Sequence, residues 1–297
     1  MTYCAVLQGP TAGRGRHNHT VADVLRALGT AGPTVRILDA HTVPDALDAC
    51  RQAVAEGAAA LVAVGGDGTV HLAIQAVAGT MVPFGVVPAG TGNDFATEVG
   101  IPADPVAAAK AVSEALRAGR TRAVDLARLV GPDGYDRYFA AVLGAGFDAI
   151  VNERANAMRW PRGPLRYDLA TYLELARLKP RQYTITVDGV AHELAAVLVA
   201  VGNSASYGGG MRICPEADNT DGLLDVVVAG PISRATLVRL KPRVYQGTHI
   251  SHPKVISMRA KIVEIAADGI TTYVDGERAC PLPVTITAEP GALRLLQ

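Results

Sequence analysis

The sequence predicts two domains, an α/β domain with a parallel sheet followed by an antiparallel β-sandwich. Up to about residue 124, short apolar runs alternate with Ala-rich segments of helical periodicity. Beyond residue 125 the pattern changes to short strand-like runs punctuated by Gly, Pro and Asp-Gly. A chain of 297 residues is also long for a single core. We therefore divide it into residues 1–124 and 125–297.

The elements of the first domain follow from continuous apolar runs for buried strands and from 3.6-residue periodicity for helices. The predicted strands are 5–7, 34–38, 61–64 and 84–87. The predicted helices are 19–28, 44–56, 70–78 and 105–118. Their alternation is a βαβ series, which implies a parallel sheet with helices on both faces.

The second domain is predicted to consist mostly of short strands. These are residues 137–142, 183–187, 193–201, 224–228, 261–266, 271–274, 284–288 and 292–296. A helical insert is expected over 149–178. Many short strands with turn residues between them favour an antiparallel sandwich.

Composition excludes several functional classes. The formal net charge is zero, so no overall field attracts nucleic acid. The longest apolar runs are of strand length, far short of the ~20 residues that a membrane-spanning helix needs. The four cysteines are scattered without a Cys-x-x-Cys pair, and the first residues lack a signal-peptide pattern. We expect a cytoplasmic protein with reduced thiols, and the sequence leaves open whether it forms a homodimer.

The most informative turn follows the predicted strand 61–64 and precedes a predicted helix. It reads Gly65-Gly66-Asp67-Gly68-Thr69. Glycines allow the backbone to approach a ligand closely, and the start of a helix offers free N–H donors to a phosphate. The alternative is an ordinary Asp-Gly turn with Thr69 as the cap of the helix.

A second turn of the same kind follows the predicted strand 84–87. It contains Gly90, Thr91, Asn93 and Asp94. Because parallel strands deliver their carboxyl ends to one edge of a sheet, the two turns are expected to face each other there and form a nucleotide site. Asp67 and Asp94 could then hold Mg²⁺ with a triphosphate, since Mg²⁺ prefers a few carboxylates together with phosphates and waters.

Together the two turns resemble a known family. Gly-Gly-Asp-Gly-Thr at 65–69 and Pro-Ala-Gly-Thr-Gly-Asn-Asp-Phe-Ala at 88–96 look like the diacylglycerol kinase catalytic-domain family, in particular its soluble bacterial lipid kinases. The resemblance covers nearly the whole chain in order, through motifs at 124–126, 144–148, 201–203, 207–211, 221–225 and 275–277. In one departure, Gly9-Pro10 stands where the family usually has Asn-Pro.

The resemblance implies ATP and Mg²⁺ as cofactors, with an NAD kinase/diacylglycerol kinase-like fold. ATP would be bound by the two glycine turns, and the acceptor would bind in the second domain. Asp125 joins Asp67 and Asp94 as a candidate for the Mg²⁺ that accompanies the nucleotide, largely through water.

Two acidic turns of the second domain take their roles from the same resemblance. The turn 218–223 would hold a structural Mg²⁺ through Asp218, Asp221 and the carbonyl of Leu223; from the local sequence alone it is a hairpin turn closed by Asp-Gly. The turn Asp275-Gly276-Glu277 also has the form of a tight hairpin turn. The resemblance implies that this turn supplies the proton acceptor for phosphoryl transfer, either Asp275 or Glu277.

Residues 154–181 are rich in arginine and contain Trp160, the chain's single tryptophan. They form either a solvated helical pair or a patch that touches a lipid headgroup layer. We therefore predict an ATP-dependent lipid kinase acting on a diacylglycerol-like alcohol, peripheral at a membrane. Two alternatives are a kinase of a soluble hydroxylated metabolite (NAD or a natural product) and a non-catalytic lipid-binding protein. The sequence does not name the acceptor.

Overall fold

The computed structural model describes residues 3–9, 18–90, 92–158, 160 and 164–297. The chain forms two compact units. The first unit comprises Met1–Leu126 together with Glu289–Gln297, and the second comprises Ala127–Ala288. The sequence pattern predicts that everything after residue 124 belongs to the second domain. The last nine residues differ because the final strand returns to the first unit, where Leu295 pairs with Phe84.

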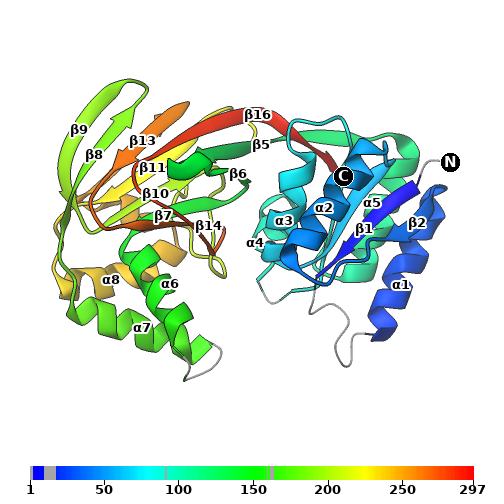
Figure 1. The fold of residues 1–297 in the computed structure, drawn as a ribbon. Coiled ribbons are helices and arrows are strands. Elements are labelled where there is room, and N and C mark those ends of the chain that lie inside the picture. The colour runs from blue at the N-terminus through cyan, green and yellow to red at the C-terminus, as the bar shows by residue number, and fades with distance from the viewer. Residues whose placement is uncertain (1–2, 10–17, 91, 159, 161–163) are drawn as a thin grey trace. The chain divides into compact units, whose positions relative to one another are not determined.

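The first unit is a parallel sheet with helices (Figure 1). Its strands are β1 (Tyr3–Gln8), β2 (Thr34–Ile37), β3 (Ala60–Gly65) and β4 (Phe84–Pro88), in the order β2-β1-β3-β4 and then the end of β16 (Val284–Leu296). Its helices are α1 (Asn18–Leu28), α2 (Val43–Ala55), α3 (Asp67–Val77), α4 (Asp94–Glu98) and α5 (Pro105–Ala118).

The strand order explains where these helices lie. Right-handed crossovers place α1 on one face of the sheet and α2 and α3 on the other, because the chain reverses direction across the sheet after β2. Accordingly α1 packs against α5, and α2 packs against α3. With both faces covered, β3 and β4 are buried along their whole length, which explains their unbroken apolar sequences. The predicted elements of this unit are confirmed, although α3 begins three residues earlier than expected.

The second unit contains two antiparallel sheets. One has the order β12-β11-β10-β7-β14-β15. Its strands are β7 (Val142–Gly146), β10 (Leu198–Gly202), β11 (Leu224–Ala229), β12 (Val255–Ala260), β14 (Thr271–Val274) and β15 (Glu277–Pro281). The other contains the first part of β16, then β13 (Ile262–Ala266), β8 (Arg181–Val187) and β9 (Val190–Ala196), with β5 (Thr121–Val130) and β6 (Asp136–Phe139) alongside.

The core of the second unit lies between its two sheets. Leu143 and Val199 from one sheet and Ile185, Val263 and Ile286 from the other are buried in a single cluster. This packing is the antiparallel sandwich that the sequence predicts. The described residues of the unit also form the α-helices α6 (Phe147–Ala157), α7 (Pro164–Ala176) and α8 (Arg234–Tyr245). The helical insert predicted over 149–178 is the pair α6 and α7. No helix of the described residues is long and apolar enough to cross a membrane.

Two differences from the predicted strands have a clear structural cause. Residues 193–201 were expected to form one strand, but β9 ends before Val197 and β10 starts after it. At Val197 the chain changes sheets: its N–H donates to the carbonyl of Ala229, and its own carbonyl accepts from Phe147. Conversely, 284–288 and 292–296 join into the single strand β16, which crosses from the second unit into the first.

Candidate functional site

The first glycine turn is shaped by contacts that leave no room for side chains. Gly66 is in extended conformation and precedes α3, which starts at Asp67. The side chain of Thr69 fills the space beside two glycines: a Cβ on Gly65 would lie 2.3 Å from its Oγ1, and one on Gly9 would lie 2.4 Å away. Glycine at position 9, where the resembled family has Asn, therefore fits the position that Thr69 takes. The start of α3 has no side-chain cap, as expected for a turn that offers its N–H groups to an anion.

The second glycine turn is stabilised by Asn93. This residue has a left-handed conformation with φ of 59°, which asparagine tolerates better than most residues. Its Oδ1 accepts from the N–H of Gly90 at 3.1 Å, and its Nδ2 donates to the carbonyl of Gly90 at 3.0 Å. Asn93 thus closes its own turn instead of capping α4 with its side chain. Thr91, also predicted to bind ATP, lies outside the described residues.

The two glycine turns touch each other, as the parallel register predicts. β3 and β4 pair from Leu61 opposite Phe84 to Gly65 opposite Pro88, so both strands end at the same edge. The N–H of Ala89 donates to the carbonyl of Gly65 at 2.8 Å. A Cβ on Gly90 would lie only 2.4 Å from the Cα of Gly66, so the backbones of the two turns are in close contact.

Asp67 joins the two glycine turns through its carboxylate. Its Oδ1 accepts from the N–H of Phe95, at the start of α4, at 3.1 Å. The side chain is half-buried, and Gly68 and Thr69 follow it in the first turn of α3. Asp67 therefore connects the two glycine turns, and it is also a candidate metal ligand. Asp94 is half-buried in the first turn of α4.

Asp125 has a clear structural contact within the first unit. It lies in β5 and is only 4 % exposed. Its Oδ1 accepts from the N–H of Gly291 at 2.7 Å, at a point where β16 adopts a positive φ of 60°. This contact fastens the returning C-terminal strand, and the proposed contribution of Asp125 to a nucleotide metal remains a prediction.

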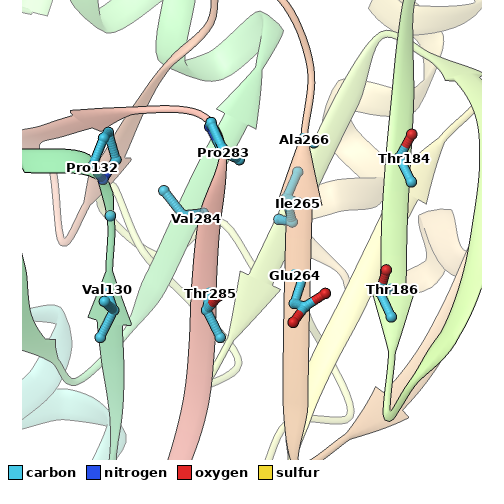
Figure 2. Close-up of a pocket in the computed structure, with 11 residues that line it drawn as sticks. Val130, Pro132, Thr184, Thr186, Glu264, Ile265, Ala266, Pro283, Val284 and Thr285 are labelled. Atoms are coloured by element: carbon cyan, nitrogen blue, oxygen red, sulfur yellow. The ribbon is translucent and has the colours of Figure 1, made fainter.

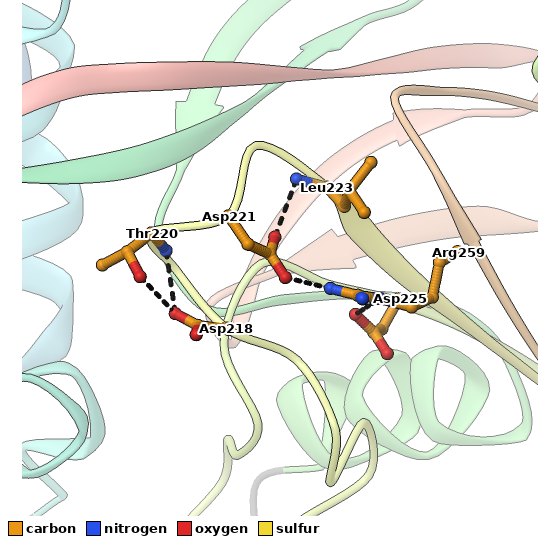
Figure 3. Close-up of polar contacts among 6 residues, drawn as sticks. All are labelled: Asp218, Thr220, Asp221, Leu223, Asp225 and Arg259. Carbon is orange, nitrogen blue, oxygen red and sulfur yellow. Dashed lines mark hydrogen bonds and ion pairs between the residues drawn. The ribbon is translucent and has the colours of Figure 1, made fainter.

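The acidic turn at 218–223 is closed by its own carboxylates (Figure 3). Oδ1 of Asp218 accepts from the N–H of Thr220 at 3.0 Å and from its hydroxyl at 2.6 Å. Oδ1 of Asp221 accepts from the N–H of Leu223 at 2.9 Å. Both are Asx-type contacts, which stabilise a polar turn.

Arg259 adds a cation to this turn that sequence reasoning did not assign. Its guanidinium donates to Oδ2 of Asp221, and its Nε lies 3.4 Å from Oδ2 of Asp225 (Figure 3). Asp225 is 1 % exposed, and burial raises the pKa of its carboxyl although Arg259 opposes that shift. Arg259 and Asp225 are opposite each other in the register of β11 and β12, so only the folded structure shows that they pair.

Asp275 and Glu277 lie on one hairpin turn between β14 and β15 but differ in their contacts and exposure. Asp275 has φ of 50°, and Gly276 has φ of 84°. Both oxygens of Asp275 accept backbone N–H groups: Oδ1 from Ala141 at 2.9 Å and Oδ2 from Ala140 at 3.1 Å. The side chain of Glu277 is exposed. The structure therefore uses Asp275 to fasten the turn to the segment before β7 and presents Glu277 to solvent.

Two further observations bear on binding. A shallow groove of about 450 Å³ lies on the outer face of the second unit's sheet, over β5, β16, β13 and β8 (Figure 2). Glu264 is the charged residue of this groove, and the groove contains no predicted site residue.

Within the part of the chain that the structure describes, no three His, Cys, Asp or Glu side chains are grouped to hold a metal ion. The metal assignments therefore remain predictions.

Comparison with known proteins decides the family. Residues 4–129 match the diacylglycerol kinase catalytic domain, and residues 141–297 match the YegS C-terminal NAD kinase beta sandwich-like domain. A diacylglycerol kinase of Mycobacterium tuberculosis is 43 % identical over 284 residues, covering 95 % of this chain and 87 % of that protein. The chain belongs to the diacylglycerol kinase family. It is accordingly a phosphotransferase with an alcohol group as acceptor.

Solved structures confirm the fold of this family member. A diacylglycerol kinase from Bacillus anthracis superposes with a TM-score of 0.73 at 22 % identity, covering 99 % of this chain and 96 % of that one. An NAD kinase from Archaeoglobus fulgidus, solved in complex with ATP, superposes with a TM-score of 0.55 at 14 % identity, covering 100 % and 94 %. At these identities the likeness establishes the fold alone.

Proposed function

We propose that the protein is an ATP-dependent lipid kinase that phosphorylates the hydroxyl of a diacylglycerol-like lipid. The observation that carries this proposal is the pair of touching glycine turns at the ends of β3 and β4, joined by Asp67. Their close backbone approach and the uncapped start of α3 suit a polyphosphate. Family membership supports a kinase acting on an alcohol.

In this proposal, Mg²⁺ bound with ATP would supply neutralisation of the charge on the transferred phosphate. Asp67 and Asp94 are the residues that would hold it, directly or through water. Asp67 suits that role because one of its oxygens is positioned by Phe95. The glycine turns bind and orient the phosphates, which matters because phosphoryl transfer depends mostly on positioning and on electrostatics.

The hairpin turn at 275–277 is proposed to supply the base. As the acceptor hydroxyl bonds to the γ-phosphorus, the bond from that phosphorus to the leaving oxygen of ADP breaks and a carboxylate takes the hydroxyl proton. The observed contacts favour Glu277 for this step, because both oxygens of Asp275 already accept backbone N–H groups. Asp275 then acts as a positioning residue for the turn.

A panel of acceptors tests the proposed reaction. ATP consumption is measured with diacylglycerol, a sphingoid base, phosphatidylglycerol and soluble diols, each with Mg²⁺. We expect turnover with a lipid alcohol of the diacylglycerol class. Turnover confined to soluble alcohols would move the protein to a metabolite kinase, and no turnover with any acceptor would favour a lipid-binding protein.

Two variants of Asp67 connect that activity to the glycine turns. Asp67→Asn keeps an oxygen for the N–H of Phe95 but removes the charge, so we expect thermal stability to be retained and turnover to fall about 10- to 100-fold. Asp67→Ala also loses the contact between the turns and should abolish transfer. Turnover near wild type in both variants, with saturating ATP and Mg²⁺, would disprove the assigned nucleotide site.

A further inference from the structure

The hairpin that carries the proposed base lies at the edge of its sheet. β15 is the last strand of that sheet, and among the described residues it pairs only with β14. β14 in turn is joined to β7 by two residue pairs, one of which is Tyr273 with Gly144. Asp275 fastens the turn itself, whereas Glu277 is the first residue of the edge strand. A strand bonded on one side is easily displaced, so the orientation of Glu277 depends on what else holds β15.

Glu153 of α6 contacts both strands of this hairpin. Its Oε2 accepts from the hydroxyl of Tyr273 in β14 at 3.1 Å. The Nε of Arg278 in β15 lies 3.3 Å from the same oxygen and 3.4 Å from Oε1. Tyr273 and Arg278 are opposite each other in the register, so their side chains share one face of the hairpin. We call Glu153, Tyr273 and Arg278 the α6 clamp.

Helix α6 is itself fixed to the sheet. It starts directly after β7, and the N–H of its first residue, Phe147, donates to the carbonyl of Val197 at 2.9 Å. The helix lies against β14 (Figure 1). Asn156, three residues after Glu153 on the same side of the helix, also hydrogen bonds the hydroxyl of Tyr273. Burial raises the pKa of that hydroxyl, so it stays protonated and donates to Glu153.

The exposure of the clamp argues against a purely stabilising role. The side chains of Glu153 and Arg278 are 49 % and 57 % exposed. Ion pairs with that much exposure contribute little to folding, because water screens them. The position of the clamp is informative instead. Its pair, Tyr273 with Arg278, directly adjoins the pair Val274 with Glu277 in the register.

We propose that Glu153 is a positioning residue for phosphoryl transfer: through Tyr273 and Arg278 it holds the hairpin so that its base meets the acceptor hydroxyl. Glu153 exchanges no proton with the acceptor. The inference rests on the proposed function for the reaction, and it holds for Glu277 or Asp275 as the base, because both lie on the same hairpin. Loss of the clamp should slow the chemical step and leave ATP binding unchanged, since the glycine turns belong to the first unit.

Glu153→Ala tests the α6 clamp by kinetics. A displacement of about 1 Å in a catalytic site costs roughly 10²-fold in rate, so we expect kcat to fall about 10- to 100-fold. It is measured with the acceptor that wild type uses best, and KM for ATP should stay at its wild-type value. Glu153→Gln should recover most of the loss, because its amide oxygen still accepts from Tyr273. A wild-type kcat in Glu153→Ala would overturn the inference.

Matched variants separate positioning from stability. Asp136→Ala breaks an ion pair with Arg128 elsewhere in the second unit, whose side chains are similarly exposed at 44 % and 42 %. It should keep the wild-type kcat. Tyr273→Phe should lower kcat by itself but add little to Glu153→Ala, because both act through one contact. Equal losses of kcat in Asp136→Ala and Glu153→Ala, or full additivity in the double variant, would make Glu153 a general structural residue and overturn the inference.

Hydrogen exchange distinguishes failure of this inference from failure of the proposed function. Amide exchange over residues 271–281, measured by mass spectrometry without ATP or acceptor, should be faster in Glu153→Ala and unchanged in Asp136→Ala. Unchanged exchange in Glu153→Ala would overturn the α6 clamp. Faster exchange in that variant, together with no phosphoryl transfer by wild type to any acceptor, would support the clamp and refute the proposed function instead.

Discussion

The two units place their candidate site residues by opposite means. In the first unit, the glycine turns come together because side chains are missing, as at Gly66 and Gly90, and Asp67 then joins them. In the second unit, the turns are held by carboxylates that accept N–H groups, as Asp221 and Asp275 do. Adding a side chain to one of these glycines should therefore disrupt the first unit's turns. Removing an acceptor carboxylate should disrupt the second unit's turns.

The largest expected effect separates the two carboxylates of the hairpin turn. Glu277→Gln should lower the rate of transfer by ~10² to 10⁴ with unchanged thermal unfolding, because it removes only a base. Asp275→Asn should also lose stability, by about 1 to 3 kcal/mol, since its amide group cannot accept from both Ala140 and Ala141. Turnover and thermal unfolding are measured for both.

The reverse pattern, with Asp275→Asn folding normally but inactive and Glu277→Gln fully active, would assign the base to Asp275. Full activity in both variants would refute a carboxylate base on this turn. ATP binding, measured by calorimetry, serves as the control and should stay close to wild type in both.

The next effect tests the close approach in the first unit. Gly90→Ala would bring a Cβ to 2.4 Å from the Cα of Gly66, so the turns must separate. Displacements of about 1 Å in a catalytic site cost roughly 10²-fold in rate, and we expect a loss of that order in kcat/KM. Gly29→Ala is the control, because its Cβ would meet nothing within 4 Å. Equal activity of both variants would show that the contact between the turns is dispensable.

A smaller effect concerns the acidic turn of the second unit. Asp221→Ala loses the contacts to Leu223 and Arg259, so the thermal unfolding temperature should fall. If the turn also holds Mg²⁺, added Mg²⁺ will raise the unfolding temperature of wild type but not of the variant. An equal response of both proteins would leave the turn as a hairpin held by its own hydrogen bonds and by Arg259.

The smallest effect is a pH dependence from Asp225. Burial raises the pKa of this carboxyl above its ordinary value of 3.8, so the folded protein binds the proton more tightly than the unfolded chain. The contribution of this group to stability is therefore highest at low pH and is lost as pH rises through the folded pKa. Asp225→Asn should flatten the dependence of unfolding free energy on pH above about 4, measured by urea titration. An unchanged slope for Asp225→Asn would contradict the assignment.

Much of the architecture could be predicted because it depends on local periodicity. The four strands and the helices of the first unit follow apolar runs and helical spacing, and helix α5 was predicted with its observed bounds. Other elements lack such a signal. Helix α8 contains Pro242 and is polar along much of its length, and strands β5, β12 and β15 carry charged residues within them. These four elements were not predicted, and β7 was missed as well, because the predicted strand 137–142 covers β6 and only the first residue of β7.

The candidate site divides in the same way between local pattern and long-range contact. The glycine turns and the acidic residues could be located from the sequence, because turn chemistry involves residues within a few positions of one another. Their bonding could not: Asp275 reaches a backbone N–H that lies 134 residues away, and Arg259 reaches Asp221 from 38 residues away.

By itself, the sequence determined the two-part organisation, the positions of both glycine turns and the resemblance that led to the family. Only the tertiary structure decided that residues 289–297 return to the first unit, that Asp275 fastens its turn while Glu277 is exposed, and that Leu165 and Tyr172 of α7 are exposed. The reason is physical. Propensity and periodicity act between near neighbours, whereas hydrogen-bond partners and exposure depend on which distant segments the fold brings together.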